Sequence, residues 1–279
     1  MVESINRNRP PVAVQTQIEL AEAIAEQQQA IATGRRIDQA SDDPQGWIEI
    51  SSLSRQQSNE QAWTNNIGRA QTRASLAESA LDTMSSTLIR ANELLIQANS
   101  GTLNANDREG IALELEGILA TLNDLVALGD GHGGALFPQA PLAIPIGENR
   151  DIVAAPSSAE LLENIGPGGE TLQQVMTLTI DAVRNGDTVD REARFAPVEA
   201  ALERVTTLIA RQGVTGNELE SARVRYEDNQ LALAERRSAI EDTDVAEAIT
   251  RLQSLSTSLE AAQAIYARIE QRSLLDLLR

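Results

Sequence analysis

The chain has 279 residues and is 42% hydrophobic but only 2% aromatic, so Ala, Leu, Ile and Val supply most of its apolar side chains. Small aliphatic residues of this kind suit narrow seams between helices better than a thick globular core. The chain has 41 acidic residues against 23 basic ones, all arginine, and its net charge of −18 argues against nucleic acid or an anionic membrane as a partner.

The sequence contains no cysteine, which excludes disulfides, thiolate catalysis and cysteine-ligated zinc. No apolar run reaches the roughly 18 residues that predict a membrane-spanning helix. The opening stretch MVESINRNRPP lacks the apolar segment of a cleaved signal peptide. We therefore expect either a cytosolic protein or one exported by a route that avoids the oxidising periplasm.

Both ends of the chain have the apolar spacing of amphipathic helices. The first helix is expected over residues 11–33, between two prolines and Gly34. The apolar positions at three/four spacing are Val14, Ile18, Ala21, Ala25 and Ala32 near the N-terminus, and Val245, Ile249, Leu252, Leu259, Ala262, Tyr266 and Ile269 near the C-terminus. Coiled-coil-like helices at both ends are typical of an assembly subunit, in which they pair with each other or with neighbouring copies.

A polar, turn-rich segment, residues 35–47, separates the first helix from a second one that is expected to continue to about residue 99. Pro44 suits the first turn of this second helix, and the acids just before it are candidate N-caps. From residue 67 to 98 the apolar positions alternate by three and four, and many are alanine, which allows close helix packing. Apolar residues between 111 and 125 then predict an antiparallel return helix.

Residues 129–169 differ from the rest of the chain because they contain five of the nine prolines and many glycines. The stretch LAIPIGENRDIVA within them predicts a small β-hairpin. We expect this segment to be an insert that faces solvent.

Helices are expected to resume over residues 171–184 and 190–212, where Gly213 and Gly216 break the second of them. A further long helix continues to about residue 240, and the terminal helix follows a short acidic interruption. The predicted fold is mostly α: a long antiparallel helical bundle with terminal coiled-coil helices and a small irregular or β-hairpin insert.

The residues predict no catalytic, metal or cofactor site, and we expect no enzyme. His132 is the sole histidine and has no cysteine or second histidine to complete a metal site. The glycines around it lack the Lys-Ser/Thr of a phosphate loop. The paired acids Asp42 and Asp43, and Asp242 and Asp244, lack the spacing of a calcium loop. Because both pairs stand just before helices, we interpret them as hinge and cap residues.

Four other side chains have two interpretations each. Trp47 and Trp63 are either packing anchors between helices or, where exposed, part of a partner surface. Arg35 and Arg36 either pair with acids of a neighbouring subunit or are simply solvated.

Several motifs, in the same order at both ends, resemble the bacterial flagellin family. TGRRI and ASDDP, within residues 33–44, are similar to the region after the first helix of that family. Residues 65–98 resemble its long inner helix, residues 239–247 resemble its C-terminal hinge, and the ending SLLDLLR is also similar. The resemblance covers most of residues 11–128 and 170–279.

The resemblance implies an extracellular structural subunit of the bacterial flagellum that takes part in cell motility. It implies copies of itself and neighbouring axial proteins of hook and filament as partners. It also implies export through the flagellum's own type III channel, with a chaperone and without a cleaved signal peptide. The expected divisions are an N-terminal coiled-coil helix and spoke, an inner rod in two halves around a surface insert, and a C-terminal coiled-coil helix: residues 1–46, 47–128, 129–169, 170–240 and 241–279.

In this family the terminal helices form the inner wall of the assembled tube. We expect aliphatic residues of the two end helices to meet in that wall: Ile18, Ile24 and Ile31 against Leu252, Leu255 and Leu259.

Two members of the family fit, of which we favour the hook–filament junction protein, and a third interpretation lies outside the family. Ser41 to Pro44 and residues 247–269 look more like the hook–filament junction protein, hook-associated protein type 3. The ending Leu277 to Arg279 looks more like filament-forming flagellin, and the insert is short for many junction proteins. The helical spacing alone also fits a soluble coiled-coil scaffold.

Overall fold

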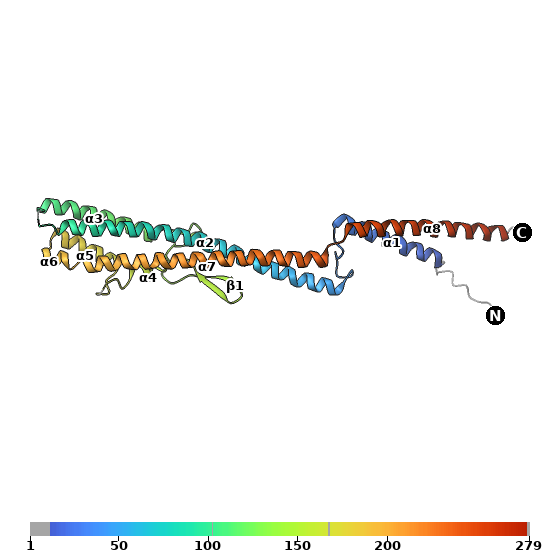
Figure 1. The fold of residues 1–279 in the computed structure, drawn as a ribbon, viewed down its shortest axis with the longest axis horizontal. Coiled ribbons are helices and arrows are strands. Elements are labelled where there is room, and N and C mark those ends of the chain that lie inside the picture. The colour runs from blue at the N-terminus through green and yellow to red at the C-terminus, as the bar shows by residue number, and fades with distance from the viewer. Residues whose placement is uncertain (1–11, 102, 167, 278–279) are drawn as a thin grey trace. The chain divides into compact units, whose positions relative to one another are not determined.

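The structure is a computed structural model that describes residues 12–101, 103–166 and 168–277. Within these residues it is mostly helical and contains a small two-stranded antiparallel sheet, which confirms the predicted fold class. In chain order the elements are α1 (Val12–Thr33), α2 (Pro44–Ala98), α3 (Ala105–Val126), β1 (Ala143–Gly147), β2 (Arg150–Val153), α4 (Ser158–Leu162), α5 (Leu172–Arg184), α6 (Thr188–Glu192), α7 (Phe195–Glu241) and α8 (Val245–Leu277) (Figure 1).

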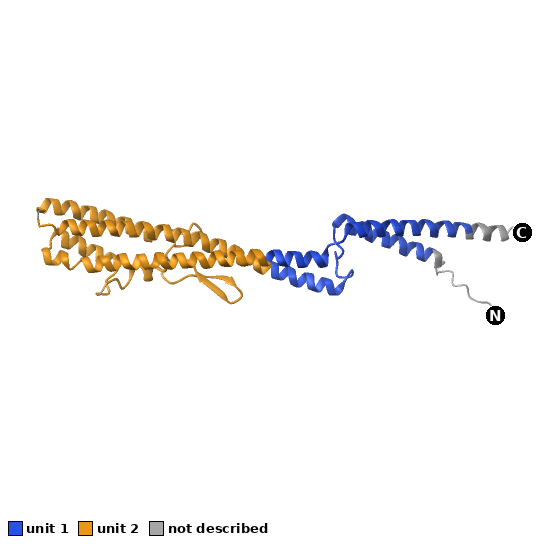
Figure 2. Ribbon diagram, viewed as in Figure 1, with its two compact units in different colours: residues 1–57, 230–279 blue, residues 58–229 orange. Residues whose placement is uncertain are grey.

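The chain divides into two compact units, which Figure 2 colours separately. Unit 1 comprises residues 1–57 and 230–279, and unit 2 comprises residues 58–229. Both divisions fall inside long helices, α2 and α7, so each of these helices supplies one part to each unit.

Unit 2 is a helical bundle in which α2, α3, α5 and α7 enclose a core of aliphatic side chains. The core includes Leu81, Met84, Leu88 and Leu95 of α2, Leu115 and Leu122 of α3, Val175 and Met176 of α5, and Val198 and Val205 of α7. Ala77 and Ala91 of α2 are fully buried, so neighbouring helices approach closely, as the alanine-rich spacing predicts. Capping boxes begin α3 and α5, where Asn104 and Thr171 satisfy free backbone N–H groups.

The β1–β2 hairpin packs on α2 and α7 within unit 2, and it occurs where the sequence predicts a hairpin. Ile146 and Ile152 of the hairpin lie in a small second core with residues of both helices. Trp63 of α2 is half-buried beside Tyr226 of α7, with ring centroids 5.6 Å apart. Of the two interpretations for Trp63, the structure therefore supports the packing anchor.

The insert, residues 129–169, is exposed over much of its length, but some of its apolar side chains lie in the bundle core. Leu136, Phe137, Leu161 and Ile165 are buried in the bundle core. These apolar residues are irregularly spaced in a segment rich in proline and glycine, so they show no helical or strand periodicity in the sequence. Each nevertheless finds a place against the helices.

The break predicted at Gly213 and Gly216 is wrong, because α7 continues through both glycines to Glu241. Each glycine costs about 1 kcal/mol relative to alanine in a helix interior. Leu208 and Leu219 are buried on either side, and burying one such side chain is worth about 1.5–3 kcal/mol. Packing therefore outweighs the local preference.

In unit 1, α1 packs along α8, and the start of α2 lies beside the end of α7, where Arg236 and Glu49 form an ion pair at 2.7 Å. The α1–α8 pair is thin. Every side chain described in α1, residues 14–33, is at least partly exposed, and Ala248 is the one buried residue among those described in α8. None of the helices in the described part of the chain has the length and hydropathy of a membrane span.

Candidate functional site

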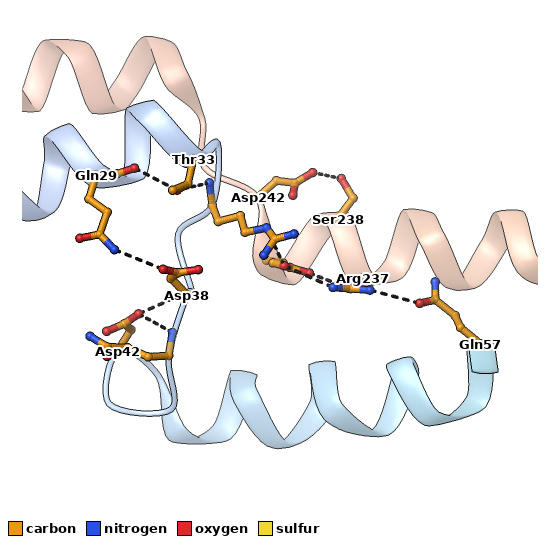
Figure 3. A network of polar contacts seen from close by, with 11 residues as sticks. Gln29, Thr33, Asp38, Asp42, Gln57, Arg237, Ser238 and Asp242 are labelled. Atoms are coloured by element: carbon orange, nitrogen blue, oxygen red, sulfur yellow. Dashed lines mark hydrogen bonds and ion pairs between the residues drawn. The ribbon is translucent and has the colours of Figure 1, made fainter. Parts of the chain in front are cut away.

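Two short segments of unit 1 link the end helices to α2 and α7, and we call residues 34–43 and 242–244 the connector (Figure 3). Gly34 ends α1 with φ of +70°, in the left-handed region that favours glycine. Its carbonyl accepts a hydrogen bond from the Thr243 N–H at 2.9 Å. The Arg36 N–H donates to the Glu241 carbonyl at 2.7 Å. Backbone hydrogen bonds thus join segments from opposite ends of the sequence.

The side chain of Glu241, only 9% exposed, is the centre of this arrangement. Its carboxylate lies 3.0 Å from the Arg35 Nε and 2.5 Å from the Arg237 Nε. Arg237 also donates to the Gln57 side chain at 3.4 Å. A carboxylate withdrawn from water needs such cationic partners, because the loss of hydration disfavours its charge. Glu241 therefore ties the connector to both α2 and α7.

Arg36 also contacts its own chain. Its guanidinium donates to the Ile240 carbonyl at 2.9 Å and lies 3.7 Å from the Asp43 carboxylate. One interpretation of the sequence was that Arg35 and Arg36 pair with acids of a neighbouring subunit. In the structure, both arginines instead find acceptors within their own chain. The side chains stay half-exposed, however, at 50% and 54%.

The four acids singled out in the sequence divide into two roles. Asp43 and Asp244 cap helices: Asp43 accepts from the Gly46 N–H at 2.9 Å at the start of α2, and Asp244 accepts from the Ala246 N–H at 2.9 Å at the start of α8. Asp42 and Asp242 do not cap, because each helix starts one residue after Asp43 or Asp244.

Asp42 instead closes the connector loop by accepting from the Asp38 and Gln39 N–H groups at 3.0 and 2.9 Å. These backbone hydrogen bonds stabilise the charged form and lower the pKa of the Asp42 carboxyl. The Asp242 carboxylate accepts from the Ser238 hydroxyl of α7.

Ile37 and Gly46 give the connector its packing, and the sequence analysis missed both. Ile37 is 1% exposed although it stands among polar residues. A Cβ at Gly46 would lie 2.6 Å from Ile37 Cδ1 and 2.8 Å from the Asp43 carboxylate, so any larger residue here would force both side chains to shift. The one available signal was an isolated apolar residue within a polar turn.

The end-helix residues expected to form an assembly interface occupy two kinds of position. Five of them are half-buried, consistent with a place on the seam between α1 and α8: Ile24, Ile31, Leu252, Leu255 and Leu259. Ile18 is 49% exposed and lies off that seam. Ile18 thus belongs to a different face of α1 from Ile24 and Ile31.

The glycine-rich loop around His132 has a structural role that the sequence did not predict. One oxygen of Asp130 accepts from the His132 and Gly134 N–H groups at 2.9 and 3.0 Å, and the other pairs with Arg73 of α2 at 2.7 Å. The backbone hydrogen bonds from His132 and Gly134, together with the charge of Arg73, lower the pKa of Asp130. Arg73 is buried and also donates to the Leu136 carbonyl at 2.6 Å. This loop is an anchor for the insert.

In the described part of the chain, no group of three or more His, Cys, Asp or Glu side chains is arranged to hold a metal ion. His132 is exposed, and its imidazole contacts the Asp130 carbonyl at 3.2 Å. The connector's polar groups are engaged with one another through ion pairs and caps. This arrangement suits a mechanical joint between helices.

Comparison with known sequences decides the family. Residues 5–140 match the family model for the bacterial flagellin N-terminal helical region, and residues 195–278 match that for the bacterial flagellin C-terminal helical region. The chain belongs to the bacterial flagellin family. A search of curated proteins finds no match. The family assignment confirms the resemblance seen in the end motifs and makes this flagellin-family chain a structural subunit of the flagellar axis.

Solved structures share the fold at low identity. A Vibrio parahaemolyticus structure described as a flagellar hook-associated protein is 17% identical, with a TM-score of 0.63 over 72% of this chain and 100% of its own. Hook-associated protein 3 of Legionella pneumophila is 13% identical, with a TM-score of 0.63 over 68% and 98%. FlgL of Xanthomonas campestris is 13% identical, with a TM-score of 0.61 over 67% and 99%. This family member therefore shares its helical fold with hook-associated proteins.

Proposed function

We propose that this flagellin-family chain is the hook–filament junction protein, an axial adaptor that joins the hook to the filament in cell motility. One observation carries the proposal: the fold matches hook-associated structures over nearly their whole length. The connector supports it, because Glu241, Arg35 and Arg237 tie two end helices to two rod helices, as an adaptor that transmits load requires.

The thin α1–α8 pair supports self-association as the mechanism. Its half-buried aliphatic residues gain little within one copy, and a neighbouring copy or another axial protein of hook or filament completes their burial. The proposed contact residues on the seam are Ile24, Ile31, Leu252, Leu255 and Leu259. The exposed Ile18 is a proposed contact residue on another face of α1, and Asp42, Asp43, Asp242 and Asp244 shape the hinge.

The proposal includes an extracellular location on the flagellum and export through its channel with a chaperone and without a cleaved signal peptide. It includes no enzymatic activity, no cofactor, and neither nucleic acid nor membrane as a partner. The absence of cysteine and the net charge of −18 are consistent with these points.

Flagellin, the filament subunit, is the second candidate, because both matched family models describe flagellin helical regions. An epitope tag inserted between the exposed Glu148 and Asn149 of the hairpin turn, followed by immunogold labelling of detached flagella, separates the two. We expect a single band at the hook end of each filament. Label along the whole filament identifies a flagellin. Label confined to the cell interior contradicts both and favours the helical scaffold.

A further inference from the structure

An apolar groove with a basic rim lies beside the connector in unit 1. Trp47 and Ile48, in the first turn of α2, are 36% and 68% exposed above a floor formed by the buried Ile37 and Ile50. The groove has a volume of about 650 Å³. Tryptophan and arginine are enriched in binding hot spots, and Trp47 lies here beside Ile48 and Arg55.

The groove is lined by three arginines, Arg35, Arg55 and Arg237, and by two acids, Asp38 and Glu241, so its net charge is positive. Arg55 follows Ile48 by seven residues, two helical turns, and therefore lies on the same face of α2. Arg55 is exposed and makes no hydrogen bond or ion pair with any residue that the structure describes. Arg35, also at the rim, has a half-exposed guanidinium. An unpaired arginine beside an exposed tryptophan favours an acidic, apolar occupant.

The outer face of α1 has the complementary character. Its apolar residues Ile18, Ala21, Ala25 and Ala32 recur at three/four spacing and are all exposed, because α1 uses another face toward α8. Glu22 lies on the edge of this face, four residues after Ile18 and three before Ala25. The helix contains three acids and no basic residue over Val12–Thr33.

The groove and the outer face of α1 are both exposed in one and the same chain, so neither covers the other within a copy. Two different, complementary surfaces on one molecule make a head-to-tail contact, in which each copy offers its face to the next. Such a contact builds closed rings or open helical arrays, which are the assemblies that an axial protein needs.

We propose that the outer face of α1 in one copy docks in the Trp47–Ile48 groove of a second copy, with Glu22 facing Arg55. This contact rests on the proposed function, because it names the surfaces through which the axial subunit associates with itself. It is separate from the α1–α8 seam and involves neither Leu252 nor Leu259.

Cysteine cross-linking tests the contact, because the chain has no cysteine of its own. Cells carry the double variant Ala25→Cys/Ser51→Cys, and their detached flagella are oxidised and analysed on non-reducing gels. We expect a ladder of dimers, trimers and higher multimers, since each copy links to the next. The matched control is Ala25→Cys/Gln56→Cys, whose second cysteine replaces an exposed residue on another side of α2, and it gives no ladder.

Charge reversal provides the second measurement. Arg55→Glu or Glu22→Arg alone should reduce incorporation into flagella at least tenfold, and the pair together should restore it, because the attraction returns with its signs exchanged. No ladder, together with unchanged incorporation of both single variants, overturns the docking contact. The immunogold band at the hook end is independent of these results, so the proposed function then still stands.

Discussion

The bundle of unit 2 and the end-helix pair of unit 1 are both made of aliphatic helices, yet they differ in how much they bury. In unit 2, side chains such as Leu81, Leu88 and Leu115 are 0% exposed. In the α1–α8 pair the described side chains of α1 all remain partly exposed. Four helices around one core complete each other's burial, whereas two helices leave half of each surface in water. Unit 2 therefore completes its core within one copy, whereas the end helices keep apolar surface that the proposed association between copies would cover.

The sharpest way to break this comparison is to place a charge in the end-helix seam. Leu252→Asp and Leu259→Asp should abolish incorporation into flagella and motility, because an unpaired carboxylate in the assembled seam is strongly disfavoured. Thermal unfolding of the purified chain should keep the main transition of wild type, since unit 2 is untouched. The measurements are swimming assays and circular dichroism melting. Normal assembly of either variant would contradict the proposed role of the seam.

A cavity in the unit 2 core should instead lower the stability of the isolated chain. Leu115→Ala removes a fully buried side chain and should lower the free energy of unfolding by about 3 kcal/mol. Leu255→Ala, on the half-buried seam, is the matched control and should cost no more than about 1 kcal/mol in the isolated chain. Urea unfolding followed by circular dichroism measures both. Equal losses would show that the two regions are stabilised alike.

The connector offers a smaller and more local test. Gly46→Ala places a methyl group against Ile37 and the Asp43 cap, and should destabilise this joint by about 1–3 kcal/mol. Because the chain has no lysine, trypsin cleaves it only at arginine, and faster nicking at Arg35 and Arg36 reports the opening. Ile37→Val removes the Cδ1 atom that the new methyl group meets.

The double variant Gly46→Ala/Ile37→Val should therefore be less destabilised than the sum of the two single variants. Additive effects would mean that Gly46 is needed for another reason, such as the Asp43 cap. Stability of unit 2 should not change in any of the three variants.

The outcomes at single positions explain what sequence reasoning could and could not reach. The spacing from Ile67 to Ala98 identified the core face of α2, because a long regular repeat admits one helical face. Gly213 and Gly216 led to a wrong prediction of a helix break, because the packing of Leu208 and Leu219 on either side is a tertiary effect. Arg73 and Ile37 escaped it, because their partners at Asp130 and Gly46 are defined by the fold and leave no pattern in the sequence.

For the end helices, the sequence predicted an apolar face but not which partner that face contacts. The three/four spacing of Ile18, Ala21 and Ala25 was correctly read as one face of a helix, but it is the outer face rather than the seam. A helix that serves two partners has two apolar faces, and periodicity alone does not say which partner takes which face.

The smallest expected effect concerns the anchor of the insert in unit 2. Hydrogen bonds from the His132 and Gly134 N–H groups, together with Arg73, lower the pKa of Asp130 below its usual value of 3.8. A carboxyl with a lowered pKa in the folded state adds stability that is complete well above pH 3.8 and is lost as the pH falls through the lowered pKa.

Asp130→Asn should therefore weaken the chain at pH 7 and lose part of its difference from wild type as the pH approaches 3. Urea unfolding of both proteins at intervals between these two values gives the difference curve, in which the contributions of other acids, such as Asp42 and Glu109, cancel. Asp82→Asn, at an exposed position of α2, is the matched control for the loss of one negative charge. If the difference between Asp130→Asn and wild type stays constant over the whole range, the Asp130 anchor contributes through shape alone. In that case the packing of Leu136 and Phe137, and not the charge of Asp130, holds the insert against the bundle.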